Sequence, residues 1–217
     1  MNYISFDVGI NNLAYCVITP EKRIINWGIL NLNENPLCCM NLRKPCKKQA
    51  SYSVGKGAEC KYYCSAHYKK VGNGKKLNSS RDLCQLSQIC INKLNALDLT
   101  TIKHVLIENQ PALKNPIMKS VQMIIYTFFI INGIMNMDSP IENIHMVNAR
   151  NKLKVYKGEP IPCTKKSKYA QNKWLSIEYT KKMIGNEDED KIQLFSLSKK
   201  KDDLADAYLQ GIYWIEK

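Results

Sequence analysis

The chain has few acidic residues, few glycines and no long apolar run, and each shortage argues against a class of protein. Only 19 acidic residues stand against 32 lysines and arginines, and the resulting net charge of +13 fits a polyanionic partner. The most apolar run, residues 123–131, is too short to cross a bilayer. No charged-then-apolar leader opens the sequence. We therefore expect an intracellular protein without a membrane span.

The rest of the composition indicates a folded protein with reduced thiols. A hydrophobic content of 45% over 217 residues supports one domain of ordinary size with room for a small insertion. Nine cysteines in a chain without a leader argue for free thiols or metal ligands and against a disulfide framework.

The most informative stretch lies at the start, where two apolar, β-prone runs flank Asp7, Gly9 and two asparagines. This pattern predicts a hairpin that carries Asp7 at the end of a core strand. A buried, unpaired carboxylate costs several kcal/mol unless it meets a cation or a metal. Asp7 therefore needs partners from elsewhere in the chain. Its alternative role is to cap the turn through backbone amides.

Two other segments of the chain supply acids that could lie beside Asp7. Glu108 ends the apolar run 105–107, and Asp203 and Asp206 lie on the first turns of a predicted C-terminal helix. Residues three apart on a helix differ by about 60° in projection, so Asp203 and Asp206 share a face. Asp202 and Asp206 are also helical neighbours, which leaves Asp202 as an alternative to Asp203.

In their order and placement, these acids resemble those of the RNase H-like nucleases. Within that superfamily the chain is most similar to the RuvC-like Holliday junction resolvases of poxviruses and other large cytoplasmic DNA viruses. Three short motifs carry the resemblance, which spans most of the chain outside residues 34–76: Phe6-Asp7-Val8-Gly9-Ile10-Asn11-Asn12-Leu13-Ala14, Ile107-Glu108-Asn109-Gln110-Pro111 and Asp202-Asp203-Leu204-Ala205-Asp206-Ala207.

The resemblance implies an α/β fold of the RNase H-like type, with a mixed five-stranded sheet flanked by helices. It also implies a catalytic set of four converging carboxylates: Asp7, Glu108, Asp203 and Asp206. Such acids would repel one another, and two Mg²⁺ or Mn²⁺ ions relieve this because hard cations prefer oxygen ligands. By family analogy Asp7 bridges the two ions, Glu108 holds the water-side ion, and the other two acids complete the shell.

Residues 34–76 form a compositional island, so we expect the main domain to comprise residues 1–33 and 77–217. The residue types of a structural zinc site occur in the island as Cys39, Cys46, Cys64 and His67. Cys38 and Cys60 are competitors for the same role. So small a segment cannot bury enough apolar surface to fold without a stabilising metal ion. Basic residues of this finger would be available to DNA phosphates: Arg43, Lys44, Lys47, Lys48, Lys61, Lys69 and Lys70.

Periodicity predicts the remaining elements. We expect strands over residues 2–8, 12–18, 23–31, 102–107 and 144–148. We expect helices from about residue 80 to 97 with Ser79 and Ser80 as N-cap candidates, over 117–135 and 169–182, and from Ser198, as the N-cap, to 214. Residues 187–190 are expected to form an acidic turn. Helix 117–135 is apolar nearly all the way round, so one side is left for a dimer surface or for burial under residues 79–97.

A basic segment follows the fifth predicted strand. Viral resolvases resemble this chain in placing a lysine after that strand, near the scissile phosphate, which makes Arg150, Lys152 and Lys154 candidates for DNA binding. Ordinary surface charge is the alternative for each of them. We expect residues 150–182 as a whole to bind phosphates. His104 and His145 lack ligand spacing and are expected to be structural.

Taken together, the motifs predict a structure-selective, Mg²⁺-dependent endonuclease that resolves four-way DNA junctions during recombination or repair. By family analogy it would leave 5′ phosphates and 3′ hydroxyls. A two-fold junction suits a homodimer. If the source is a virus, the place of action would be the host cytoplasm.

Three other functions share some of these sequence features. One alternative is a non-catalytic nucleic-acid-binding module. Another is an RNase H-type nuclease acting on RNA–DNA hybrids. Actin-like sugar kinases also begin with a strand and Asp-x-Gly, but ten glycines leave no glycine-rich phosphate loop after Glu108.

Overall fold

The computed structural model describes residues 1–33, 35–41, 44–77, 82–113 and 115–217. The N-cap candidates Ser79 and Ser80 and the basic residue Arg43 lie outside these ranges. Contacts divide the chain into two compact units, one formed by Met1–Leu32 with Leu86–Lys217 and the other by Asn33–Gln85. The two units are described separately.

A mixed five-stranded sheet lies at the centre of the first unit. Its first three strands form an antiparallel meander, β1 (Asn2–Asp7), β2 (Asn12–Ile18) and β3 (Ile24–Asn31). Strands β7 (Ile102–Glu108) and β8 (Asn143–Val147) run parallel to β1, and the order is β3-β2-β1-β7-β8. The predicted mixed sheet is therefore confirmed.

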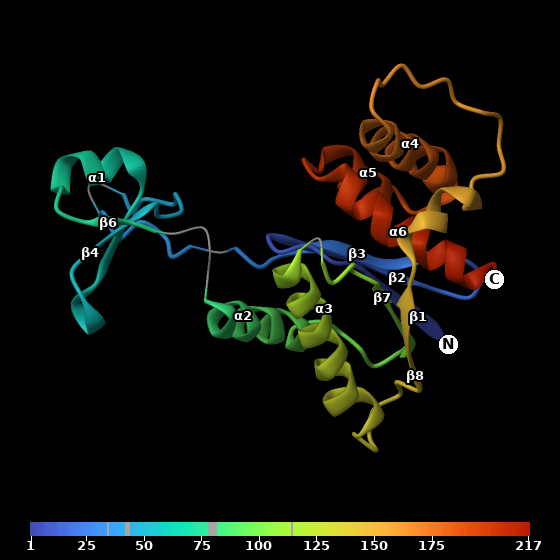
Figure 1. Cartoon of the computed structure of the whole chain (residues 1–217), viewed down its shortest axis with the longest axis horizontal. Coiled ribbons are helices and arrows are strands. Elements are labelled where there is room, and N and C mark those ends of the chain that lie inside the picture. Colours follow the sequence, from blue (N-terminus) through green and yellow to red (C-terminus); the bar gives the residue numbers. More distant parts are fainter. Residues whose placement is uncertain (34, 42–43, 78–81, 114) are drawn as a thin grey trace. The chain divides into compact units, whose positions relative to one another are not determined.

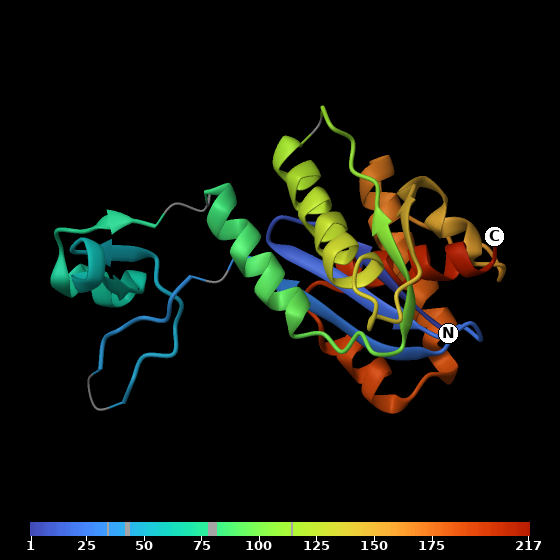
Figure 2. The ribbon, with the colours of Figure 1, turned by 90° about the horizontal axis from the view of Figure 1, so that it is seen from below.

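Both faces of this sheet are buried. Successive side chains of a strand point to opposite faces, so each strand can contribute to both. On β2, Leu13, Tyr15 and Val17 join one apolar cluster, whereas Ala14, Cys16 and Ile18 join the other. Helices α2 (Leu83–Asn95) and α3 (Pro116–Phe129) cover the first face. Helices α5 (Glu189–Leu197) and α6 (Lys201–Ile215) cover the second, and α4 (Lys168–Met183) packs on α6. In Figure 2 the sheet lies between α3 (yellow-green) and α6 (red).

Helix α3 buries only part of its apolar surface. It begins where Asn115 Oδ1 accepts a hydrogen bond from Met118 N at 3.2 Å, with Pro116 in the first turn, and it continues beyond Phe129 as the π-helical segment η2 (Ile130–Ile134). Val121, Ile125, Phe128 and Phe129 are buried, whereas four apolar side chains are at least 42% exposed: Ile117, Met123, Ile131 and Ile134.

In the part of the chain that the structure describes, Pro116–Ile134 alone has the length and mean hydropathy of a membrane span. Its buried side chains pack on the sheet, as those of a core helix do.

The C-terminal region departs from the prediction at two points. Residues Glu189–Leu197 form helix α5, where only an acidic turn was expected at residues 187–190. Ser198 follows α5 and accepts a hydrogen bond from Lys200 N at 3.0 Å, and Lys200 occupies the N-cap of α6 without a side-chain cap. The prediction that Ser198 caps the last helix was therefore wrong, because the N-cap position lies two residues later, at Lys200.

The second unit is a small three-stranded sheet with one α-helix; strands β4 and β6 and helix α1 are labelled in Figure 1. Strands β5 (Lys61–Tyr63), β4 (Tyr52–Val54) and β6 (Lys75–Lys76) pair in that order, and α1 (Ser65–Val71) packs with its Tyr68 ring stacked on Tyr52 at 3.8 Å between ring centroids. The buried apolar cluster of this unit consists of Cys38, Tyr63 and Cys64. Thiols thus occupy the place where a larger domain would have aliphatic side chains.

Candidate functional site

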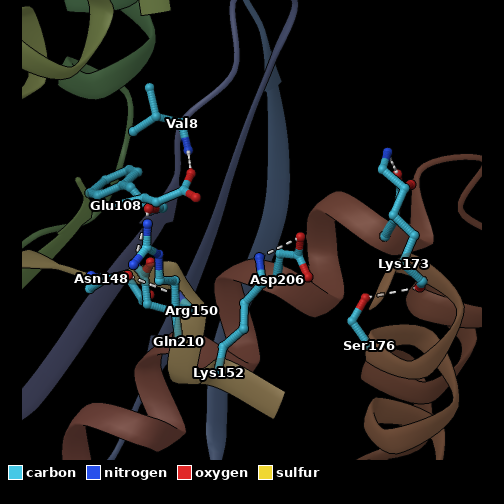
Figure 3. A network of polar contacts seen from close by, with 12 residues as sticks. Val8, Glu108, Asn148, Arg150, Lys152, Lys173, Ser176, Asp206 and Gln210 are labelled. Atoms are coloured by element: carbon cyan, nitrogen blue, oxygen red, sulfur yellow. Dashed lines mark hydrogen bonds and ion pairs between the residues drawn. The ribbon is translucent and has the colours of Figure 1, made fainter. Parts of the chain in front are cut away.

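Asp7 and Glu108 come together because their strands are parallel neighbours. Phe6 pairs with Ile107, so Asp7 and Glu108 are the next residues on adjacent strand ends. Glu108 Oε2 accepts hydrogen bonds from Val8 N at 3.3 Å, drawn in Figure 3, and from Gln110 Nε2 at 2.5 Å. Burial raises the pKa of Asp7 well above its ordinary value, and the charge of Glu108 raises it further. An anion at Asp7 is therefore unfavourable unless a cation lies beside it.

Helix α6 brings Asp203 and Asp206 to the same end of the sheet. Gln210, one turn after Asp206, is buried and donates from Nε2 to Ser5 Oγ and to Phe6 O, both at 3.1 Å. Next to it, a Cβ at Gly211 would lie 2.5 Å from Ile18 Cδ1 and 3.2 Å from Ser5 Cβ, so glycine lets α6 approach the sheet closely without displacing the Ile18 side chain. These two residues fix the helix against the sheet. The four acids then line one open pocket of about 730 Å³.

Asp203 is bound to the opening hairpin. Asn12 Nδ2 donates to Asp203 Oδ2 at 3.3 Å. Burial raises the pKa of Asp203, and the neighbouring charge of Asp202 raises it further. Asp202 instead pairs with Lys173 at 2.5 Å, and this bond holds the pKa of Asp202 below its ordinary value against the effect of burial. Asp203 lines the pocket, and Asp202 is not among the lining residues in the described part of the chain.

A lysine is enclosed among the acids. Lys152, in the 3₁₀ segment η3 (Ala149–Val155), places Nζ 2.5 Å from Asp206 Oδ2, and the two side chains are only 16% and 19% exposed (Figure 3). Burial alone would lower the pKa of Lys152, but the charges of Asp206 and Asp7 outweigh it and raise the pKa. The other oxygen of Asp206, Oδ1, is buried and has no hydrogen-bond partner among the described residues.

The other two basic candidates differ in position. Arg150 lines the pocket together with Lys152, and its backbone N–H donates to Asn148 Oδ1 at 3.0 Å. Lys154 is exposed and is not among the lining residues, within the described chain. Further polar residues extend the pocket wall along α4 and the start of α6: Tyr169, Asn172, Lys173 and Lys200.

In the second unit, four metal-binding side chains converge. The ligand atoms of Cys38, Cys46, Cys64 and His67 all lie within 4.8 Å of one another. The Sγ atoms of Cys38 and Cys64 are 3.4 and 3.5 Å from His67 Nδ1. In a tetrahedral zinc site, metal–ligand distances of 2.0–2.3 Å put a sulfur and a nitrogen roughly 3.6 Å apart. The backbone amide of His67 lowers the pKa of Cys64, which favours the thiolate that a metal requires.

The cluster contains Cys38 where Cys39 was predicted. Cys38 N donates to Lys48 O and Cys39 N donates to Tyr62 O, so the two backbone amides bond to two different segments of the same unit. Successive side chains of an extended segment point in opposite directions. Cys38 is therefore 5% exposed and inside the cluster, whereas Cys39 is exposed and outside it. The assignment of Cys39 was wrong for this reason.

His104 and His145 lie away from the acids. His104 stacks between Tyr3 and His145, with ring centroids 4.9 and 5.9 Å away, and His145 packs on Trp214 at 4.4 Å. Burial lowers the pKa of both imidazoles. These contacts agree with a structural role.

Two site-forming glutamines carried no assigned role in the sequence-based prediction. Gln210 is a polar residue on the face of α6 that otherwise buries Leu204, Ala207, Tyr208 and Gly211. Gln122 is likewise fully buried in the apolar helix α3. A buried amide needs hydrogen-bond partners, so a lone glutamine within an apolar stripe was the available signal.

The five-stranded mixed sheet with its flanking helices defines the class of fold, which is that of solved Holliday junction resolvases. The yeast mitochondrial Holliday junction resolvase Ydc2 superposes with a TM-score of 0.54 at 16% identity, over 98% of this chain and 78% of that one. The fowlpox virus resolvase, solved in complex with substrate Holliday junction DNA, gives a TM-score of 0.51 at 17% identity, over 100% of this chain and 97% of that one. The predicted resemblance is confirmed in fold.

A relative in sequence comes from a large DNA virus. An uncharacterized protein of Acanthamoeba polyphaga mimivirus is 34% identical over 249 residues, covering 94% of this chain and 59% of that protein. The chain thus spans about three fifths of the length of this relative. No protein-family model matches the chain.

Proposed function

We propose that this protein is a structure-selective endonuclease that resolves four-way DNA junctions by metal-dependent hydrolysis of phosphodiesters. The observation that carries the proposal is the convergence of Asp7, Glu108, Asp203 and Asp206 on one pocket with Lys152 and Arg150 in its wall. Junction processing is what this chain's structural neighbours are named for, and their fold is the same. The cellular context would be recombination or repair of viral DNA.

The acids fit hard divalent cations. Burial and Glu108 disfavour the charged form of Asp7, so its pKa is raised, and Asp206 Oδ1 is a buried acceptor without a partner among the described residues. Oxygen-only donors of this kind suit Mg²⁺ or Mn²⁺. We assign Asp7, Glu108, Asp203 and Asp206 as the residues that would hold such ions. Ions held there would supply an activated water and charge stabilisation for the leaving 3′ oxygen.

The basic residues complete the site. Lys152 lies beside Asp206 and compensates part of the negative charge of the acids. We assign Lys152 and Arg150 to the scissile phosphate, because both line the pocket that the acids share. Lys154 is exposed, so its assigned contact is with flanking backbone phosphates.

We propose that residues 34–76 are an inserted zinc-binding module held by Cys38, Cys46, Cys64 and His67. The zinc would be structural, because all four positions are filled by protein ligands. Ten lysines and arginines against two acids make this segment strongly basic, which supports its contact with phosphates along a junction arm.

We further propose that two copies act together. A four-way junction has two-fold symmetry, and a two-fold dimer would present two sites to opposed strands. The exposed apolar side chains of α3 and η2 supply a surface for this pairing: Ile117, Met123, Ile131 and Ile134. The mimivirus relative supports a viral source, for which the site of action would be the host cytoplasm.

The test is cleavage of labelled four-way, flap, RNA–DNA hybrid and linear duplex substrates, each with and without Mg²⁺. We expect paired cuts in the junction, only with the metal. Activity confined to the hybrid would instead indicate an RNase H-type enzyme. Junction binding without any cleavage would indicate a non-catalytic module.

The substitution Asp7→Asn should abolish cleavage and keep junction binding, because it removes a ligand charge and leaves the basic residues in place. Asp202→Asn is the matched control, since Asp202 pairs with Lys173 and is not among the pocket-lining acids of the described chain. Its cleavage rate should stay within a few-fold of that of the wild type. An Asp7→Asn protein that cuts at full rate would refute the site assignment.

A further inference from the structure

We propose that Gln110 is a positioning residue, whose side-chain amide holds one oxygen of Glu108 so that the carboxylate presents its other oxygen to a divalent cation. Gln122 holds Gln110 in turn. The proposal deepens the proposed function, since it rests on Glu108 being a metal ligand.

Two hydrogen-bond donors hold the Oε2 atom of Glu108. Gln110 Nε2 donates to Glu108 Oε2 at 2.5 Å and also lies 3.4 Å from Val8 O, and Val8 N donates to the same Oε2 at 3.3 Å. The terminal torsion of a glutamate side chain is otherwise broad. Two donors on one oxygen select one orientation of the carboxylate.

A buried glutamine supports this arrangement from α3. Gln122 is 0% exposed, and its Oε1 accepts from Gln110 N at 2.8 Å and from Lys119 Nζ at 3.1 Å. Its neighbours on the helix are the buried apolar residues Val121 and Ile125. An amide in such surroundings is costly unless it is hydrogen-bonded. Its acceptor fixes the backbone immediately after β7, where Gln110 leaves the strand.

The chemistry of an amide suits this role. It donates a hydrogen bond without carrying charge, so it orients Glu108 and leaves the full negative charge for a cation. A lysine at position 110 would compete with the metal, and a carboxylate would add repulsion to an already crowded set of acids. Groups that orient metal ligands in this way typically change metal affinity by about 10–100-fold when they are removed.

The experiment is a double-mutant cycle on Mn²⁺ binding, followed by electron paramagnetic resonance of free Mn²⁺ without DNA. Gln110→Ala should weaken Mn²⁺ binding by about 10-fold or more. In a Glu108→Gln background the same substitution should change the affinity less than about two-fold, because the group through which it acts is gone. Gln193→Ala, at an exposed position of α5, is the matched control and should leave Mn²⁺ binding unchanged.

A structural role alone would give a different pattern. Equal weakening by Gln110→Ala with and without the carboxylate at position 108, or no weakening at all, would overturn the proposal. Gln122→Met is a second variant that keeps the side-chain volume and removes the acceptor for Gln110 N. It should weaken Mn²⁺ binding in the same background-dependent way, and it decides the question if Gln110→Ala fails to fold.

The two proposals fail separately. A wild-type protein that binds Mn²⁺ with the expected dependence on Gln110 but leaves junctions uncut would refute the proposed function only. A wild type that cuts junctions while Gln110→Ala binds Mn²⁺ normally would refute the positioning role only. A wild type that binds no Mn²⁺ would overturn both.

Discussion

Replacing Cys38 by serine should release zinc from the second unit, whereas replacing its neighbour Cys39 should not. The two residues are adjacent and chemically identical, so each is a control for the other. Cys38 Sγ lies 3.4 Å from His67 Nδ1, while Cys39 is exposed and outside the cluster. The comparison therefore tests the geometry of the site and not merely its cysteine content.

The magnitude follows from how little else holds this unit together. Its buried apolar cluster is Cys38, Tyr63 and Cys64, and burial of one large side chain contributes only about 1.5–3 kcal/mol. Structural zinc sites contribute roughly 10–16 kcal/mol, so loss of one of four ligands removes on the order of 3–4 kcal/mol. This corresponds to roughly 10²–10³-fold in zinc affinity.

Zinc affinity can be measured by competition with a chromogenic chelator, and folding of the unit by limited proteolysis within residues 34–76. Wild type and Cys39→Ser should each retain one zinc ion and resist cleavage, and Cys38→Ser should lose both properties. Excess chelator should make the wild type behave like Cys38→Ser. The reasoning fails if Cys39→Ser loses zinc, or if Cys38→Ser retains it at wild-type affinity.

Two further predictions concern the first unit. Lys152→Met should destabilise the metal-free protein by about 3 kcal/mol, because it leaves Asp206 without its buried partner, and Mg²⁺ should restore part of the loss. Thermal unfolding with and without Mg²⁺ measures this loss of stability. Lys103→Met is the control: it breaks an exposed pair with Glu142 and should lower the stability by less than about 1 kcal/mol. Equal losses in the two variants would contradict the buried pairing of Lys152 with Asp206. Stability should also fall as pH drops below about 6.5, the ordinary pKa of histidine. Burial lowers the pKa of His104 and His145, outweighing the opposite effect of Glu142 on His104, so the unfolded chain binds protons first. The unfolding temperature of a His104→Gln, His145→Gln protein should lose this dependence, and an unchanged pH profile would refute the explanation.

Local sequence predicted most elements of the first unit and placed its first two acids at strand ends. Apolar, β-prone runs identify β1, β2, β3, β7 and β8, and β2 and β3 contribute side chains to the apolar clusters on both faces of the sheet. Asp7 and Glu108 each end an apolar run, and carboxyl ends of adjacent parallel strands meet at one edge. The position of each acid at a strand end can be read without coordinates, whereas the parallel pairing of the two strands was implied only by the family resemblance.

Other features depend on contacts between distant segments, and the tertiary structure alone decided them. Cys38 and Cys39 are adjacent and of the same residue type. Only their backbone hydrogen bonds to the segments at Lys48 and Tyr62 determine which thiol points into the cluster. The hydrogen bonds of Gln210 to β1, of Gln110 to Glu108 and of Gln122 to Gln110 link positions whose spacing carries no periodic signal. In sequence, Arg150, Lys152 and Lys154 are equivalent candidates for phosphate binding. The fold of η3 places Lys152 beside Asp206. Burial and charge pairing are properties of the assembled fold, and for that reason these residues could not be singled out from the chain itself.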